Sequence, residues 1–471
     1  MVFLGAAAPK RIFNKLGRQY LILACVLLLP GAAFASLSTG EIGLSNTNYL
    51  NPYANHVTNF PMLQGGLFEE FDNGSIQAKA DPEGYVLFLP GTPYYFESPE
   101  AYVGISPKLS PVQASVGRKL EHWSRLDEIW QTGLWQPRSL WDEVHPETVG
   151  LTGAFLEVNL PDFHAAGFAS PIFVPDRGAP IQFQNGSMFS FNPYFSSPAS
   201  TISLYSVNTP VNYDLNAPSV TDILGHSGAS LMARGGSDQG PWLSGAYAYL
   251  PINQLAISYA SRVNAATTPV EVDAVIFPNI VYHHIASIES GYAAGKSQIT
   301  FSYLHDMPVA QGPLDGQTTQ IFSEAQAASA TVQYGLEGPA ERKLDTALLL
   351  SYLHTWGGNA PDQGVDASGD GTVGDSRYPY QSAGLFQLDS KLPGLLIPRL
   401  KISTRLLYDF SHQGTIWSTL LRYGFRPDFE FSLGADVLTS GLDANSDQAA
   451  LDFISRNRAN DRVSMGLSYV F

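Results

Sequence analysis

The chain has 471 residues, of which only 14 % are charged, while aromatic residues make up 12 % and Gly and Pro number 43 and 32. The net charge of −16 argues against nucleic-acid binding, because phosphate contacts need clustered Lys and Arg. A soluble chain usually carries about a quarter charged residues, and no apolar run here is long enough for a spanning helix. We therefore expect a chain that buries its surface as a sheet closed on itself.

Residues 1–35 have the pattern of a secretory signal peptide. The positive start carries the four cations of this segment, Lys10, Arg11, Lys15 and Arg18. An apolar core at 21–29 and a small-x-small sequence then predict cleavage near Ala35. Loss of four cations would lower the net charge from −16 to −20. The only cysteine, Cys25, lies in this segment, so the mature protein is expected to have no thiol, disulfide or cysteine-metal site.

Alternating apolar and small or polar residues predict β-strands along the mature chain, because side chains of a strand point to opposite faces in turn. In the first half, the predicted strands are 84–89, 101–106, 111–118, 151–160, 179–189 and 201–207. From residue 228 onward, twelve are predicted, near 228–234, 242–249, 255–263, 280–290, 296–305, 328–336, 346–356, 380–390, 399–410, 416–425, 429–438 and 462–471.

The connections between these strands alternate between short and long. The short ones are 250–254, 291–295, 337–345, 391–398 and 426–428, and the long ones are 264–279, 306–327, 357–379 and 439–462, with 411–415 as a brief exception. This alternation is typical of outer-membrane barrels, whereas a soluble sandwich has no reason to sort its loops. We predict an all-β, single-domain transmembrane antiparallel β-barrel over residues 36–471, with long extracellular loops. At about 25 residues per strand and connection, it would have 16 or 18 strands.

The segment 118–150 holds four of the seven tryptophans, interspersed with charges of both signs. A long loop of this kind could fold into the lumen as a constriction, where aromatic faces and charges would suit sugars or other ring-bearing solutes. The candidate constriction residues are Arg118, Lys119, Trp123, Arg125 and Trp130. The alternative interpretation is that the tryptophans only pack the loop onto the barrel wall.

A second candidate site is an acidic stretch within one of the long loops. Asp366, Ser368 and Asp370 stand at the first, third and fifth positions of a calcium-loop pattern, and Gly371 follows. Arg377 occupies position twelve, where a bidentate carboxylate is required. Calcium binding and a plain acidic extracellular loop, bridged by divalent ions to lipopolysaccharide phosphates, both remain open. No other cofactor is expected.

The charged residues of the C-terminal strands form the third candidate. If the apolar set faces lipid, the charges must face the lumen, because a charge on the lipid face near the midplane would cost roughly 2–4 kcal/mol. The inward set is Lys401, Arg405, Asp409, Arg422, Glu430 and Asp436. Such residues set ion selectivity in pores, but they could equally form a closed salt-bridge ladder that plugs the lumen.

The C-terminal strand carries a resemblance to a known class. Phe471 is the last residue, and Val463, Met465, Leu467 and Tyr469 alternate behind it. This ending resembles the C-terminal strand of Gram-negative outer-membrane β-barrels, and the chain looks porin-like. The resemblance implies an integral outer-membrane location and contact with outer-membrane lipid and lipopolysaccharide. It also implies recognition by the barrel-assembly machinery. The oligomeric state stays open.

The function predicted from these patterns is a channel or porin for passive diffusion of small hydrophilic solutes, with carbohydrate or ion selectivity left open. The alternative is a plugged surface barrel with a structural or adhesion role, whose lumen would be filled by 118–150 or by 36–71. The sequence contains no HExxH, P-loop or dinucleotide motif, and we predict that the protein is not an enzyme.

Overall fold

The computed structural model describes part of the chain. The described residues are 36–51, 57–89, 93–105, 110–178, 180–195, 198–237, 239–310, 316–337, 345–358, 371–373, 377–392, 399–443 and 452–471. The predicted signal peptide and the candidate calcium residues Asp366, Ser368 and Asp370 lie outside these ranges.

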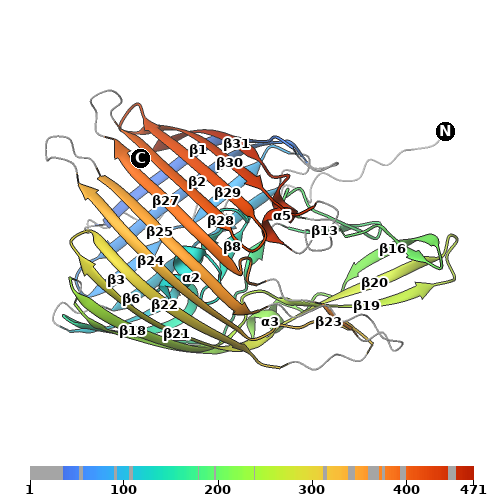
Figure 1. Cartoon of the computed structure of the whole chain (residues 1–471), viewed down its shortest axis with the longest axis horizontal. Coiled ribbons are helices and arrows are strands. Elements are labelled where there is room, and N and C mark those ends of the chain that lie inside the picture. Colours follow the sequence, from blue (N-terminus) through green and yellow to red (C-terminus); the bar gives the residue numbers. More distant parts are fainter. Residues whose placement is uncertain are drawn as a thin grey trace, which may run out of the picture. The chain divides into compact units, whose positions relative to one another are not determined.

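The fold is an all-β, closed antiparallel barrel of 18 strands (Figure 1), which confirms the fold class and the higher of the two predicted strand numbers. Two wall positions each consist of two short strands, β3 with β4 and β5 with β6, which extend the wall beside β2. The wall strands are β1 (Ser36–Tyr49), β2 (Asn59–Asp72), β3 (Ile76–Ala80), β4 (Glu83–Leu87), β5 (Tyr94–Glu97), β6 (Ala101–Ile105), β7 (Val112–Lys119), β10 (Leu151–Leu160), β11 (Phe163–Ser170), β17 (Gly228–Gly236), β18 (Pro241–Pro251), β21 (Tyr282–Ala294), β22 (Ser297–Pro308), β24 (Ala325–Glu337), β25 (Asp345–Gly357), β27 (Ser382–Leu392), β28 (Leu400–Asp409), β29 (Gly414–Gly424), β30 (Phe429–Thr439) and β31 (Arg462–Val470).

The barrel closes between its first and last strands. β1 pairs antiparallel with β31, from Glu41 opposite Val470 to Tyr49 opposite Arg462. The backbone of Gly40 and that of Phe471 exchange two further hydrogen bonds, of 2.8 and 2.9 Å. The plugged-barrel alternative placed the segment 36–71 in the lumen, but its two strands β1 and β2 are part of the wall, so that part of the alternative is wrong.

The two faces of the wall differ as the alternation predicts. On β31, Met465, Leu467 and Tyr469 are exposed on the outer face. On β28, the outer residues Leu406 and Tyr408 are exposed, while their neighbours point inward. A continuous apolar outer face is what a bilayer requires of a spanning barrel.

Three predicted strands lie outside the wall. Residues 255–263 form most of β19 (Ala256–Asn264), which pairs with β20 (Glu271–Asn279) as a long hairpin outside the barrel sheet (Figure 1). The segment 250–254 therefore begins a long loop and is not a turn. The predicted strands 179–189 and 201–207 likewise contain only short strands outside the wall. Alternation identifies a strand, but it does not identify the sheet that the strand joins.

In the described ranges, the strands outside the wall form three smaller sheets. β15 (Thr201–Leu204), β16 (Val207–Leu215), β20, β19, β23 (Thr318–Gln320) and β26 (Gly371–Val373) make one sheet. The others join β12 (Arg177–Gly178), β8 (Arg138–Leu140) and β9 (Glu147–Thr148), and pair β13 (Gln182–Gln184) with β14 (Ser187–Phe189).

The described helices are short: α2 (Arg125–Trp130), α3 (Val220–Leu224) and α5 (Phe453–Asn457). None of the helices in the described ranges is long and apolar enough to cross a membrane.

The wall depends on close contact between β6 and β7 at Gly117. This residue has φ +133°, and a Cβ added to it would lie 2.3 Å from the carbonyl oxygen of Ala101 and 2.7 Å from the Cα of Tyr102. We predict that Gly117→Val lowers the free energy of unfolding by about 1–3 kcal/mol, because backbone atoms cannot yield to the added carbon. Urea unfolding of the refolded protein measures this difference.

The matched control is Gly235→Ala in β17, where an added Cβ meets nothing within 4 Å. Equal stability of the Gly117 and Gly235 variants would contradict the close β6–β7 contact.

Candidate constriction inside the barrel

The loop between β7 and β10, residues 120–150, crosses the lumen. The indole Nε1 of Trp130 donates to Ser351 Oγ of β25 at 3.1 Å. Arg125 donates to Gln333 Oε1 of β24 at 2.9 Å. Because β7 is the fifth wall strand and β25 the thirteenth of 18, these contacts join opposite sides of the barrel. The loop therefore lies across the barrel interior (Figure 1).

The N-terminus of helix α2 is held to the wall by one carboxylate. Glu289 Oε1, on β21, accepts hydrogen bonds from Ser124 Oγ at 3.1 Å and from the backbone N–H of Arg125 at 2.7 Å and of Leu126 at 3.4 Å. The first N–H groups of a helix have no partner within the helix, and the positive end of its dipole favours an anion. Glu289 thus fixes both the position and the direction of α2.

A second buried carboxylate, Asp127, shapes the chain after the helix. Its oxygens accept from the backbone N–H of Leu134 at 3.0 Å and of Trp135 at 3.0 Å. The hydroxyl of Thr132 donates to it as well. The turn after α2 is therefore ordered from within the loop, and Trp135 is directed into the interior.

The loop brings an apolar cluster into the lumen. Trp123 and Trp135 stack with ring centroids 5.9 Å apart and planes at 7°. Trp123 and Trp130 are each only 2 % exposed, so their faces are covered by protein. The inward-facing wall residues of this cluster include Phe155, Phe168, Ile285, Leu304, Leu353, Leu385 and Leu407. Trp123 and Trp130 therefore pack the loop against the wall, as the alternative interpretation of the segment expects.

The predicted basic residues at the start of the loop are paired. Arg118 donates to Glu97 Oε1 at 2.6 Å and to the Ser98 carbonyl at 3.0 Å. Lys119 pairs with Glu157 and lies 3.4 Å from Glu121 Oε2. Both cations are therefore compensated by wall and loop carboxylates at the edge of the interior.

Arg405 anchors the loop from the wall on the other side. This residue of β28 donates to Gln131 Oε1 at 2.8 Å. Together with the contacts of Trp130 and Arg125, this bond holds the loop to β24, β25 and β28. The structure thus brings together six of the predicted residues at the level of the loop, namely Arg118, Lys119, Trp123, Arg125, Trp130 and Arg405.

Three other predicted residues form a separate group nearer the end of the barrel with the chain termini. Lys401 Nζ lies 3.4 Å from Glu430 Oε2, and Arg422 Nε lies 3.8 Å from Glu430 Oε1. The cations stay open to water, with 52 % and 51 % of their side chains exposed. Asp409 belongs to neither group, because it lies at the opposite end of β28 beside His412.

A buried network at β30 and β31 joins one predicted inward residue, Asp436, to residues that were not site candidates. Arg462 lies 2.6 Å from Asp436 Oδ2 and 2.5 Å from Asp142 Oδ2, and the Tyr194 hydroxyl donates to Asp142 Oδ1 at 2.8 Å. Burial opposes the charged form of Asp142, but Arg462 and His145 outweigh it and lower the pKa of this carboxyl below its ordinary value. The network ties loop 120–150 to the closing strand. Asp436 was predicted to face inward, but nothing in the sequence pairs it with Arg462 or Asp142.

Comparisons with known proteins find similar solved structures but no match in sequence. No family model and no curated protein matches the chain. Among solved structures, the chain is similar to OccK2 (OpdF) of Pseudomonas aeruginosa in complex with glucuronate, with 11 % identity, a TM-score of 0.46, and coverage of 93 % of this chain and 98 % of that chain. OccK3 (OpdO) of the same organism has 12 % identity and a TM-score of 0.46, covering 93 % and 96 %. OccAB4 of Acinetobacter baumannii has 10 % identity and a TM-score of 0.43, covering 93 % and 98 %.

These similar structures are outer-membrane porins. With TM-scores below 0.5, these similarities carry no argument of their own, and the fold of this chain stands on its own strand pairings. A functional argument must come from the interior of this barrel.

A pH prediction follows from Glu147, which lies in β9 of the loop. Burial, and then the neighbouring carboxyl group of Glu83, raise the pKa of Glu147 to about 9 from an ordinary 4.5. The folded protein therefore holds a proton that the unfolded chain releases, and stability is lost as pH rises from about 4.5 toward 9. We predict that Glu147→Gln raises the free energy of unfolding at pH 7–8 and leaves it unchanged below pH 4.

Urea unfolding across this pH range measures the effect, with Glu70→Gln, at an exposed position of β2, as the control. A Glu147→Gln difference that stays constant with pH would show that the carboxyl is not protonated in the folded state.

Proposed function

We propose that the protein is an outer-membrane channel for passive diffusion of small hydrophilic solutes, and that loop 120–150 forms its constriction. The observation that carries the proposal is the loop itself, which crosses the lumen and is held to the far wall by Trp130, Arg125 and Arg405. An 18-stranded wall is wide enough to enclose an aqueous lumen unless something narrows it.

The wall away from the loop supports a water-filled path. Lys401 and Arg422 are half exposed on the inner face. Asp389, on the neighbouring strand β27, accepts from Gln387 Nε2 at 2.7 Å and from Ser403 Oγ at 2.5 Å. A barrel that served only as a scaffold would have no need of hydrated charges along its interior. This favours a channel over the plugged surface barrel.

Selectivity in this proposal comes from charge. Trp123 and Trp130 are covered by protein, so their faces are not offered to a passing sugar ring. The hydrated group instead contains two cations, Lys401 and Arg422, around one anion, Glu430. Fixed charges in a narrow lumen attract counter-ions. The exposed cations Lys401 and Arg422 favour small anions over cations, while the less exposed Asp389 on β27 opposes this preference, so the expected anion preference is small.

The outer face of the wall supports a location in the outer membrane. The outer face of the wall is apolar, and a closed barrel satisfies its backbone hydrogen bonds without water. We propose that the mature chain, cleaved near Ala35, inserts into the outer membrane with its short turns and both mature termini on the periplasmic side.

The charge variants test the selectivity. In planar bilayers under a salt gradient, we predict ion-conducting steps with a modest anion preference. We expect the double variant Lys401→Gln/Arg422→Gln to move the reversal potential toward cation preference, because Glu430 and Asp389 then remain without these two cations. Arg262→Gln, a charge change in β19 outside the barrel sheet, should leave the potential unchanged.

The loop anchor is tested separately. Glu289→Ala removes the acceptor for three N–H or O–H donors of the loop, so we predict larger or noisier conductance steps. Folded protein that never conducts would overturn the channel proposal. Conductance that is unchanged in Glu289→Ala would overturn only the role of the loop.

A further inference from the structure

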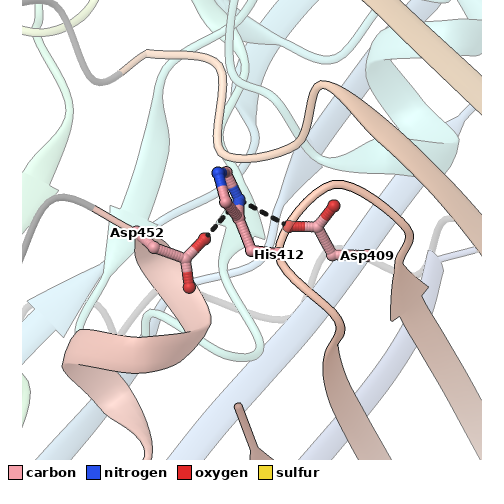
Figure 2. Close-up of side chains that lie close together, drawn as sticks. All are labelled: Asp409, His412 and Asp452. Carbon is pink, nitrogen blue, oxygen red and sulfur yellow. Dashed lines mark hydrogen bonds and ion pairs between the residues drawn. The ribbon is translucent and has the colours of Figure 1, made fainter. Parts of the chain in front are cut away.

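Three polar side chains meet where β28 ends, away from the loop contacts described above. Asp409 is the last residue of β28, His412 lies in the turn before β29, and Asp452 directly precedes α5. Figure 2 shows both carboxylates directed at one edge of the His412 ring. The ring Nδ1 lies 3.0 Å from Asp409 Oδ2 and 3.1 Å from Asp452 Oδ1.

The two carboxylates are buried, and one oxygen of each already accepts a hydrogen bond from a backbone N–H. The Asp409 side chain is 0 % exposed and that of Asp452 is 1 % exposed. Asp409 Oδ1 accepts from the Ser411 N–H at 2.9 Å, and Asp452 Oδ2 accepts from the Ser455 N–H at 2.8 Å. The two remaining oxygens both turn toward the same nitrogen.

One ring nitrogen cannot satisfy both oxygens. It carries at most one proton, and its hydrogen bond goes to Asp409. Asp452 Oδ1 is then a buried carboxylate oxygen without a hydrogen-bond donor among the described residues. Leaving a charged acceptor in this state is costly. A cation placed between Asp409 Oδ2 and Asp452 Oδ1 would compensate both carboxylates at once.

We propose that Asp409, His412 and Asp452 bind a divalent transition-metal ion of the zinc class through Oδ2, Nδ1 and Oδ1. An imidazole nitrogen beside carboxylate oxygens suits zinc, whereas calcium and magnesium prefer oxygen ligands alone. Ligand atoms around tetrahedral zinc lie about 3.4 Å apart. The distances from the ring nitrogen are close to this value, and the three ligand atoms lie within 4.8 Å of one another. A water molecule completes the coordination from the side of His412, which is partly exposed.

The ion would join two separate segments at one end of the barrel. Asp409 and His412 belong to the connection between β28 and β29, and Asp452 belongs to the loop between β30 and β31. From that loop, α5 sends Ile454 into the apolar cluster and Arg456 to within 3.2 Å of Glu143 in loop 120–150. Metal binding therefore stabilises the placement of α5. The site does not depend on the proposed channel function.

The test uses the tag-free, refolded protein, stripped with a chelator and titrated with zinc sulfate by calorimetry, with bound zinc counted by elemental analysis. We expect one zinc ion per chain and a higher melting temperature with zinc. We expect His412→Gln and Asp452→Asn each to weaken binding at least tenfold. His305→Gln is the matched control, because His305 also faces a carboxylate, that of Glu324, at 2.7 Å but outside the cluster.

Folding of each variant is checked by its heat-modifiable migration in gels. Cobalt substitution gives a second readout, since a cobalt ion held by His412 should give visible absorption that His412→Gln loses. Three results would overturn the proposal. They are no zinc bound by the folded protein, binding of calcium but not zinc, and zinc binding unchanged in His412→Gln.

Discussion

The pairing of β1 with β31 is the interaction on which the rest of the structure depends. In a bilayer, an unpaired sheet edge would leave a row of N–H and C=O groups without partners, and each costs several kcal/mol. The antiparallel register from Glu41–Val470 to Tyr49–Arg462 removes both edges at once. Once the sheet is closed, every strand has one outer and one inner face. The position of each charge then follows from its parity along the strand.

Closure of the sheet also leaves a wide interior. A wall of 18 strands encloses more space than wall side chains alone can fill. At the level of loop 120–150, the space is occupied by three tryptophans and the wall residues around them. Nearer the short-turn end, hydrated side chains such as Lys401 and Arg422 line it instead. We regard this division between a packed level and a hydrated level as the basis of the proposed channel.

Residue alternation predicted the features that depend on one strand alone, such as which side chains face inward. The inward orientation of Lys401, Arg405 and Glu430 follows from alternation with a period of two, and the structure has the same parity. β11 was missed because Ala and Gly dominate its sequence, so its apolar face is hard to recognise. Residues 255–263 were assigned to the wall because a strand outside the barrel alternates just as a wall strand does.

The path of the loop could not be predicted in this way. The helix cap from Glu289 joins residues 165 positions apart, and the bond from Arg405 to Gln131 joins residues 274 apart. No local pattern reports such contacts, because either partner could have been satisfied by water or by a neighbour. The same holds for Asp452, which the sequence gives no reason to place beside Asp409 and His412. Tryptophan density identified the loop that matters, but only the fold shows what the tryptophans contact.

The most direct test of the account places a reactive thiol on the hydrated inner wall. Cys25 is the only cysteine of the chain and lies in the predicted signal peptide, so Lys401→Cys would carry the single thiol of the mature protein. We predict that a charged thiol reagent reduces the single-channel current of this variant in discrete steps and leaves the unsubstituted protein unaffected. A conducting variant whose current does not change on complete modification would contradict a solute path along this wall.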